Sequence, residues 1–440
     1  MNLLFISLGC DKNLVDTEKM LGILGKEGYS FVDDENEADI VVVNTCCFIG
    51  DAKEESINTI LQMAELKKTG RLKALIVTGC LAQRYKQEII DEIPEVDAIL
   101  GTTSYEAVGE AIKEVMHGET PEVFESIDAP VSKTTDRLVT TGGHYAFLKI
   151  AEGCDNRCAY CVIPSLRGRY RSRTFESLLE EARGLAERGV RELIVIAQDI
   201  TRYGMDRKDG SSLAGLLGEL CKLDFHWVRL HYLYPEVITD DLIETMAKNP
   251  KIVHYLDIPI QHCNDKILRA MRRHTTKADI QALFAKLRKA MPDVVLRTSL
   301  ICGLPGEGEA EFEELCQFLR EEKLQRAGVF QFSPEEGTLA ERMEDQVPGE
   351  VAARRVELVV DLQSRIMDEY NEERLGTVME VLCEGFDTQA GCFVGRTYAD
   401  SVEIDGHVYF TAAGVVPAGT FVNVRITGTM DGDLTGEIDE

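Results

Sequence analysis

The first part of the chain alternates short apolar runs with longer amphipathic ones. The apolar runs are rich in Val, Ile and Leu, which indicates strands of a buried parallel sheet. These expected strands are Leu3–Leu8, Ile40–Val43 and Ala74–Val77, and the helical patterns between them are Leu14–Glu27 and Lys53–Lys68. The alternation predicts an open parallel α/β sheet domain over residues 1–116.

A polar stretch rich in Thr, Ser, Gly and Pro covers residues 117–143 and predicts a linker. Over residues 144–370, strand and helix patterns alternate again with a longer repeat. The expected strands are Ala146–Ala151, Glu192–Ala197, Trp227–Leu233, Tyr255–Ile260, Val294–Ile301 and Gly328–Phe332, and the helices include Phe175–Arg188, Thr239–Lys248, Lys277–Ala290 and Glu309–Lys323. Six such units predict a partial (β/α)6 barrel, short of the eight that close a full barrel. Its open side suits a bulky substrate.

The last part of the chain, residues 371–440, changes character. Helical patterns give way to short apolar runs at Val378–Val381, Val402–Ile404, Val408–Phe410 and Phe421–Ile426. Asp405-Gly406 is a suitable hairpin turn between two of these runs. The pattern predicts a small antiparallel β-barrel.

Composition narrows the class of protein. The net charge is −28 over 440 residues, so the chain lacks the excess of Lys and Arg that phosphate contacts need, and nucleic acid is not an expected partner. The 44% of hydrophobic residues argues against disorder. No apolar run approaches the ~18 residues of a membrane span, and no basic stretch precedes the first apolar residues. We therefore expect a cytoplasmic protein that does not use a membrane.

Thirteen cysteines in so long a chain indicate reduced thiols that bind metal or catalyse, rather than a secreted disulfide scaffold. The strongest pattern is Cys154, Cys158 and Cys161, a CxxxCxxC directly after the first strand of the barrel-like domain. Three thiolates can hold three corners of a four-iron cube and leave the fourth iron open to a substrate. A zinc site or idle thiols are the alternatives. Zinc would usually need a further Cys or His pair at short spacing, and none occurs before His231.

This motif, with Tyr160 before its last cysteine, resembles that of the radical S-adenosylmethionine (SAM) enzymes. The resemblance implies that Cys154, Cys158 and Cys161 hold a [4Fe–4S] cluster whose free iron chelates SAM. One electron would then split SAM into methionine and a 5′-deoxyadenosyl radical.

The same resemblance implies SAM contacts from Tyr160, from Gln198 at the end of the second strand, and from Ile301 in the segment that faces the adenine in relatives. The segments around Gln198 and Ile301 depart from the usual family wording. Ordinary packing at the strand ends is the alternative for both.

A second set of cysteines becomes visible only when the predicted fold is considered. Cys10, Cys46 and Cys80 are far apart in sequence, yet each closes one of the three strands expected in the first domain. Parallel strands end along one edge of a sheet, where ligands bind, so three thiolates would meet there. Taken singly, each cysteine could be a small buried residue. Cys47 is an alternative ligand, although alternation along the strand lets only one of the neighbouring pair face the site.

Two three-cysteine sets followed by a small β-barrel (TRAM-like, OB-like) resemble the methylthiotransferase family over essentially the whole chain. The resemblance implies an auxiliary [4Fe–4S] cluster on Cys10, Cys46 and Cys80 that handles the sulfur methylated by one SAM. A second SAM would supply the radical that removes a hydrogen from an unactivated carbon, where the methylthio group is inserted. It also implies a reducing electron donor such as a flavodoxin or ferredoxin, and a sulfur source.

Five arginines crowd the segment after the second motif, where either a solvated face or contact with a substrate carboxylate or SAM would explain them. They are Arg157, Arg167, Arg169, Arg171 and Arg173. The cysteines outside the two sets show no ligand spacing, and we expect packing or surface roles for them.

The family acts either on an adenosine of transfer RNA or on an aspartate of a ribosomal protein. Residues 371–440 carry three arginines and no lysine against thirteen acids, which would repel an RNA backbone and attract a basic protein. Solubility alone is the bland explanation of these acids. The segment Leu8–Asp16 also resembles the protein-modifying branch. We therefore expect methylthiolation of the β-carbon of an aspartate in small-subunit ribosomal protein twelve. A transfer-RNA adenosine methylthiotransferase and a non-enzymatic iron–sulfur carrier are the alternatives.

Overall fold

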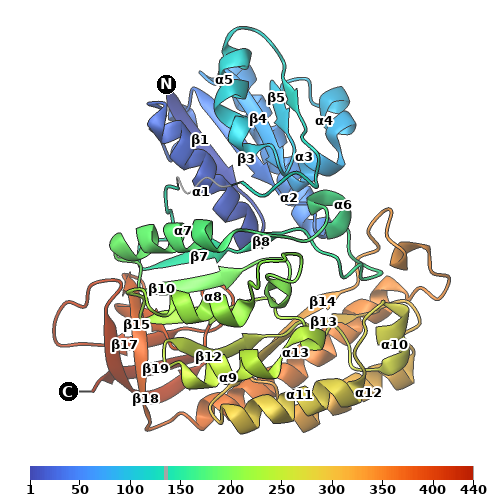
Figure 1. Ribbon diagram of the computed structural model, residues 1–440, viewed down its shortest axis with the longest axis vertical. Coiled ribbons are helices and arrows are strands. Elements are labelled where there is room, and N and C mark those ends of the chain that lie inside the picture. The colour runs from blue at the N-terminus through green and yellow to red at the C-terminus, as the bar shows by residue number, and fades with distance from the viewer. Residues whose placement is uncertain (133–136, 440) are drawn as a thin grey trace.

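The computed structural model describes residues 1–132 and 137–439. Figure 1 shows the amino-terminal sheet above, the barrel-like sheet in the middle and a small β-barrel at one end of it. Residues 133–136 of the expected linker and the final acid, Glu440, lie outside the described part. Within that part, no helix is both long and apolar enough to cross a membrane.

The amino-terminal sheet is parallel throughout, with the strand order β2-β1-β3-β4-β5-β6. Its strands are β1 (Asn2–Ser7), β2 (Ser30–Phe31), β3 (Ile40–Thr45), β4 (Ala74–Gly79), β5 (Ala98–Leu100) and β6 (Glu122–Val123). Its helices are α1 (Asp11–Lys26), α2 (Gly50–Thr69), α3 (Cys80–Arg84), α4 (Lys86–Glu92) and α5 (Val108–Met116). Side chains alternate along each strand, so Val42 packs under α1 and α5 while Val41 packs under α2, α3 and α4. The expected open α/β sheet is confirmed.

The barrel-like sheet has six parallel strands in the order β14-β13-β12-β11-β10-β7. They are β7 (Tyr145–Lys149), β10 (Glu192–Ile196), β11 (Trp227–Leu230), β12 (Ile252–Asp257), β13 (Val295–Cys302) and β14 (Arg326–Gln331). A short pair, β8 (Ala151–Glu152) and β9 (Arg171–Ser172), brackets the cysteine loop. The outer strands β7 and β14 do not pair, so the expected partial barrel is confirmed.

Helices cover the outside of this barrel. They are α7 (Phe175–Glu187), α8 (Leu213–Leu220), α9 (Asp240–Lys248), α11 (Lys277–Ala290), α12 (Glu309–Glu322) and α13 (Gly349–Glu372), with α6 (Ile163–Arg167) and α10 (Asp265–Ala270) near the cysteine loop. Leu178, Phe284 and Leu315 pack from three of them onto the sheet. The sequence patterns named four of these helices but not the longest, α13, which covers β13 and β14.

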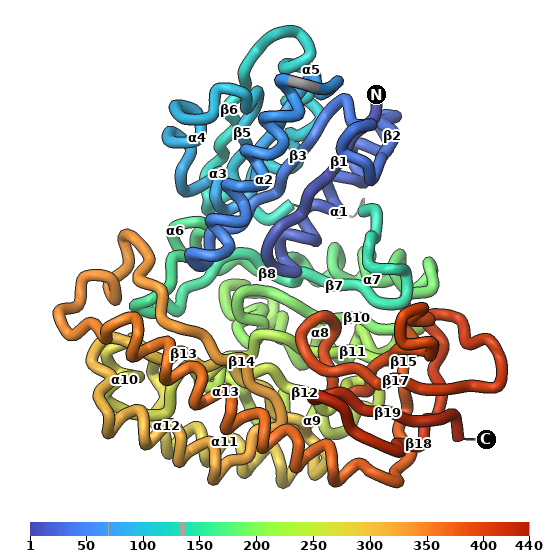
Figure 2. The backbone as a smooth tube through the Cα atoms, turned by 180° about the vertical axis from the view of Figure 1, so that it is seen from behind, coloured from blue at the N-terminus to red at the C-terminus, as the bar shows by residue number. Residues whose placement is uncertain are grey.

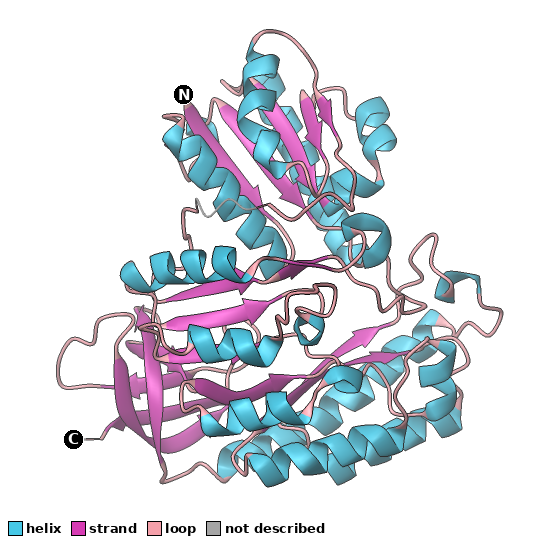
Figure 3. Cartoon of the chain, in the orientation of Figure 1, coloured by secondary structure: helices cyan, strands magenta, loops and turns pink. Residues whose placement is uncertain are grey.

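The carboxy-terminal unit is a closed barrel in the order β15-β16-β17-β19-β18 (Figure 3). Its strands are β15 (Val378–Asp387), β16 (Cys392–Arg396), β17 (Val408–Thr411), β18 (Phe421–Met430) and β19 (Asp433–Ile438). All pairings are antiparallel except that of β17 with β19. The expected small barrel is confirmed in outline.

The hairpin expected at Asp405-Gly406 is wrong, because Val402–Ile404 forms turns and not a strand. The loop from Thr397 to Gly406 instead enters the bottom of the six-stranded barrel. Tyr255 donates its hydroxyl to Asp405 at 2.6 Å, and the segment's polar groups are satisfied there rather than by a neighbouring strand.

One apolar cluster joins all three units inside the open barrel. Val402 from the carboxy-terminal loop and Val15 from α1 pack with Tyr145, Phe147 and Ile194 on the inward face of β7 and β10. Figure 2 shows the lower end of α1 resting beside β7 and β8. The amino-terminal sheet is thereby fixed over the cysteine loop of the barrel.

Candidate active site

The amino-terminal cysteines lie where three neighbouring strands end. Cys46 and Cys80 directly follow β3 and β4, and Cys10 follows β1 after two further residues. These strands are adjacent and parallel, so their ends share one edge of the sheet. The thiols of Cys10 and Cys80 both raise the pKa of Cys46, which indicates that the three lie near one another.

Gly9 permits this close approach. Its φ of +87° lies in the left-handed region, and an added Cβ would stand 2.7 Å from the Sγ atom of Cys46. A side chain at this position would therefore push the turn that carries Cys10 away from Cys46.

Asn13 and Arg167 tie the three cysteine loops to one another. The Asn13 amide donates to the carbonyl oxygens of Leu8 and Thr45, each at 3.0 Å. Arg167, from the other domain, donates to the Asn13 side-chain oxygen at 2.5 Å and to the Cys80 sulfur at 3.6 Å. The amino-terminal set is therefore completed by a cation of the barrel domain.

Burial changes the acidity of these thiols. It raises the pKa of Cys46 to about 12, and the thiols of Cys10 and Cys80 contribute to the rise. It also raises the pKa of Cys80, against the lowering effect of the Arg167 guanidinium. Raised pKa values keep Cys46 and Cys80 protonated at neutral pH, whereas a bound iron centre would replace those protons. The donor set therefore fits an iron–sulfur cluster.

Cys47 occupies a different environment from Cys46. It is fully buried in the apolar core that α2 forms with β3 and β4, together with Ile60 and Val77. Cys46 instead lies against Gly9, at the edge of the sheet where the strands of the three cysteines end. The geometry favours Cys46 as the ligand.

The second set lies in the loop between β8 and α6. Cys158 is buried, and Cys154 and Cys161 are half-buried. The backbone N–H of Cys154 donates to the Gly168 carbonyl at 3.1 Å, which closes the loop at its base. Burial raises the pKa of Cys154 to about 12 and that of Cys161 well above its ordinary range, and Cys158 adds to both shifts. This set too would accept iron in place of its protons.

Two residues near Cys158 were not found from the sequence. The Tyr234 hydroxyl lies 2.7 Å from the Cys158 sulfur, and the Arg273 guanidinium lies 4.1 Å from the centre of the Tyr234 ring. Tyr234 follows β11 and Arg273 follows α10, so neither belongs to a local motif. The cation and the hydroxyl together form one wall of the cysteine loop.

Two of the three residues expected to contact SAM share one environment, and the third has a different one. Tyr160 and Ile301 both pack against one apolar cluster beside the cysteine loop, which includes Ala159. Gln198 instead donates from its Nε2 atom to Glu152, at 3.2 Å. Its side-chain oxygen is buried and has no partner among the described residues.

A buried network of charges connects the two cysteine sets. Arg167 donates to Asp16 of α1 at 2.8 Å and to Glu152 at 3.2 Å. Lys149 pairs with the same two carboxylates, lying 2.8 Å from Glu152. Glu152 stands two residues before Cys154, and Arg167 contacts Cys80. The network therefore runs from one set to the other through the domain interface.

The other arginines of the crowded segment are divided between the interior and the surface. Arg173 is buried and pairs with Glu181 at 2.7 Å, whereas Arg157 and Arg169 are exposed. Arg171 donates to the Arg169 carbonyl at 2.6 Å. The segment is thus neither a uniform solvated face nor a uniform anion site.

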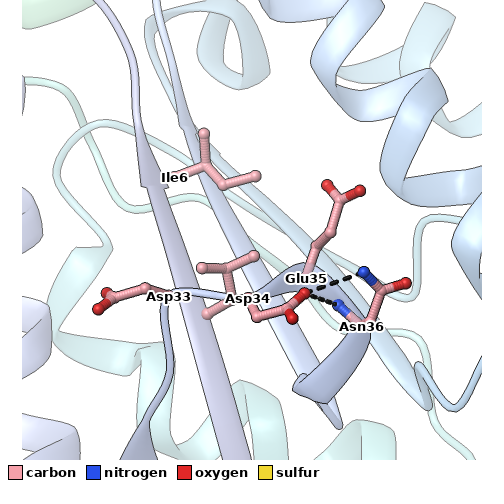
Figure 4. Close-up of a pocket in the computed structure, with 6 residues that line it drawn as sticks. Ile6, Asp33, Asp34, Glu35 and Asn36 are labelled. Carbon is pink, nitrogen blue, oxygen red and sulfur yellow. Dashed lines mark hydrogen bonds between the residues drawn. The ribbon is translucent and has the colours of Figure 1, made fainter.

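Within the described residues, we find no site for a single metal ion, and the hollow described next adds no candidate active site. No three Cys, His, Asp or Glu side chains there are close enough to share one metal ion. A hollow of about 650 Å³ lies on the amino-terminal domain, lined by Ile6 and by an acidic turn. Figure 4 shows these side chains. In that turn the Asp34 carboxylate accepts from the backbone and side chain of Asn36, both at 2.9 Å. These bonds cap the turn itself.

Family models match three consecutive parts of the chain. They are Uncharacterized protein family UPF0004 at residues 2–101, the Radical SAM superfamily at residues 148–319 and the TRAM domain at residues 375–438.

Among solved structures, the fold is similar to that of the radical SAM methyltransferase TsrM from Kitasatospora setae. The TM-score is 0.58 at 13% identity, covering 84% of this chain and 90% of that one. For the cobalamin-dependent radical SAM enzyme OxsB the TM-score is 0.53 at 12% identity, covering 83% of this chain and 61% of the other. At such identities the likeness shows the fold alone.

Curated relatives match over nearly the full length. A protein of Lachnoclostridium phytofermentans named ribosomal protein uS12 methylthiotransferase RimO is 52% identical over 437 residues, which is 99% of each chain. Proteins of the same name from Thermoanaerobacter sp. and Clostridioides difficile are each 46% identical, covering 99% and 98% of this chain and 99% and 97% of their own. With its three matched domains and these relatives, the chain belongs to the RimO family of radical SAM methylthiotransferases.

Proposed function

We propose that this protein adds a methylthio group to the β-carbon of an aspartate in the small-subunit ribosomal protein uS12. The observation that carries the proposal is the full-length similarity, at 46–52% identity, to several proteins named for that activity. The arrangement of two three-thiol sets on the two sides of one domain interface supports it.

The cysteine sets are the proposed cluster ligands. Cys154, Cys158 and Cys161 would hold the [4Fe–4S] cluster that binds SAM, and their shared loop, with the Arg273 cation nearby, supports this assignment. When bound, the clusters and SAM supply a reducing electron, a carbon radical, a methyl group and a site for sulfur.

The auxiliary [4Fe–4S] cluster is assigned to Cys10, Cys46 and Cys80. The shared sheet edge, the close approach at Gly9 and the Arg167 contact on Cys80 support this second assignment. A guanidinium at a thiolate stabilises its negative charge. Arg167 thereby favours the thiolate form of Cys80, which is the form that binds iron.

The chain's other residues would orient the bound groups. Tyr160 and Ile301 offer an apolar wall suited to the adenosine of SAM, and the Gln198 amide is held in place by Glu152. Arg273 lies beside the cysteine loop, where it adds positive charge close to Cys158. These assignments rest on position and chemistry.

The charge of the carboxy-terminal barrel suits a basic protein partner. Some of its acids are internal: Asp400 pairs with Arg326 at 2.7 Å and Glu384 with Arg396 at 2.7 Å. Among the described residues from 372 onward, the exposed acids are Glu372, Glu373, Glu380, Glu403, Asp431 and Glu437. They would attract a basic ribosomal protein and disfavour nucleic acid.

The remaining partners follow from the reaction. A cytoplasmic setting, a reducing donor such as a flavodoxin or ferredoxin, and a sulfur source are what the proposed reaction needs. Ribosomal proteins are cytoplasmic substrates in bacteria, and SAM cleavage consumes an electron.

The test is an anaerobic assay of the reconstituted protein with SAM and a reductant, offered uS12 and transfer RNA in parallel. Mass spectrometry should show one methylthio group in place of one hydrogen on an aspartate of uS12. The same gain on an adenosine would instead establish the transfer-RNA activity. SAM cleavage with neither product would leave the radical chemistry and remove the proposed substrate.

A further inference from the structure

Lys12 lies in the interface between the amino-terminal domain and the barrel domain. It lies in the first turn of α1, two residues after Cys10, and only 7% of its surface is exposed. Its ammonium group stands 3.1 Å from the centre of the Tyr232 ring of the barrel domain. The side chain thus crosses from the amino-terminal sheet to the top of the barrel.

Tyr232 belongs to a segment that also contacts the second cysteine set. Two residues further along, the Tyr234 hydroxyl lies 2.7 Å from the Cys158 sulfur. The cation of Lys12 therefore sits between Cys10 of one set and the segment that reaches Cys158 of the other. Under the proposed function, the carbon that receives sulfur lies between the two cysteine sets.

The backbone of this segment is strained. Tyr232 has φ +65°, in the left-handed region that a bulky aromatic residue rarely adopts. Its N–H donates to the Asp257 carboxylate at 3.2 Å, and its carbonyl accepts from the N–H of Ile200 at 3.1 Å. Such strain is retained where a side chain must be held in one place. Here it holds the ring beneath the Lys12 ammonium.

The other cations of the interface have more carboxylate partners than Lys12. Lys149 and Arg167 each pair with both Asp16 and Glu152. Among the described residues, Lys12 pairs with Asp11, its own neighbour, at 2.9 Å. An ammonium has three donors, so this contact leaves capacity for a second carboxylate.

We propose that Lys12 binds the carboxylate of the substrate aspartate and so places its β-carbon between the two cysteine sets. The inference rests on the proposed function and deepens it by naming the residue that selects an acidic side chain. Tyr232 shields the ammonium from water on one side, which strengthens its attraction for a carboxylate.

The experiment is a double-mutant cycle on binding. The full-length enzyme, reconstituted without oxygen, is titrated with full-length uS12 and with uS12 whose target aspartate is replaced by asparagine. The wild-type enzyme should bind the asparagine form on the order of tenfold more weakly. Lys12→Met, similar in length but neutral, should bind both forms alike. Lys12→Arg keeps the charge and should retain part of the preference.

Matched measurements separate the possible outcomes. Lys222→Met, an exposed lysine at the far end of the barrel, should leave the preference intact. If Lys12→Met lowers the affinity for both forms of uS12 by the same factor, the variant keeps the full preference for aspartate. That result would overturn the inference. Iron content of each variant shows whether the cysteine sites are still formed. If the wild-type enzyme modifies no aspartate of uS12, the proposed function fails, whereas a modified uS12 with an unchanged preference in Lys12→Met overturns the inference alone.

Discussion

The two cysteine sets reach similar surroundings by opposite routes. Cys154, Cys158 and Cys161 are neighbours in sequence and share one loop, so their spacing is fixed by the chain itself. The amino-terminal cysteines are far apart in sequence. They meet at one edge of the sheet only because three parallel strands align. The first set is therefore local, and the second depends on tertiary structure. The second should be the more sensitive to changes away from its own cysteines.

The largest expected effect separates the roles of the two sets. Cys154→Ala removes a proposed ligand of the SAM-binding cluster, so SAM cleavage should fall to background. Iron held by the amino-terminal set should remain, since the two sites share no ligand. Cys263→Ala, a buried cysteine outside both sets, is the matched control. Cleavage that survives Cys154→Ala would contradict the assignment.

Arg167→Met tests whether the amino-terminal set depends on the barrel domain. The change removes the donor to Cys80 and leaves Lys149 as the one cation that pairs with Asp16 and Glu152 among the described residues. Removing one partner of a buried ion pair costs about 3–5 kcal/mol of stability. We expect iron to be lost mainly from the amino-terminal set. Iron analysis and thermal unfolding would measure both effects, with exposed Arg169→Met as control. Equal iron loss from both sets would argue against the specific role of Arg167.

Gly9→Ala probes the close approach of the Cys10 turn to Cys46. The new Cβ would meet Cys46 and the backbone would stay in the left-handed region, together costing roughly 2–4 kcal/mol. Gly28 also has φ +87° but nothing within 4 Å of its added Cβ, so Gly28→Ala isolates the backbone strain. Denaturant unfolding should show the larger loss for Gly9→Ala. The same loss in both variants would mean that contact with Cys46 is unimportant.

The last prediction concerns Lys19, a buried residue of α1 whose ammonium has no hydrogen-bond partner among the described residues. Burial lowers its pKa to about 7, and the nearby Arg173 contributes. The unfolded chain holds this proton up to about pH 10.4, so the folded state binds fewer protons in between and stability should rise from about pH 7 to 10. Lys19→Met should be more stable than the wild type near pH 7, and the difference should shrink as pH rises. Unfolding curves at several pH values would show a constant difference if this is wrong.

Sequence reasoning found the features that rest on strand order and local spacing. Parallel strands ending in cysteines identified Cys10, Cys46 and Cys80, and the local motif identified the other set. Tyr234 and Arg273 escaped, because each approaches Cys158 from a loop with no pattern of its own. Such contacts are fixed only when the barrel closes around the cysteine loop.

The error at Val402–Ile404 has a similar cause. An apolar run beside Asp405-Gly406 carries the pattern of a hairpin, but Val402 is buried inside another domain rather than in a strand pair. The backbone there is satisfied by turns and by partners such as Tyr255. Local pattern could not reveal which domain would receive the side chain.

The most direct test of the two-site account is iron and sulfide analysis, with Mössbauer spectroscopy, of three reconstituted proteins. These are the wild type, a variant with Cys10, Cys46 and Cys80 changed to Ala, and one with Cys154, Cys158 and Cys161 changed to Ala. The account predicts about eight irons per chain in the wild type and about four in each variant. A variant that keeps all of its iron, or that loses both clusters at once, would contradict the claim that each set holds its own cluster.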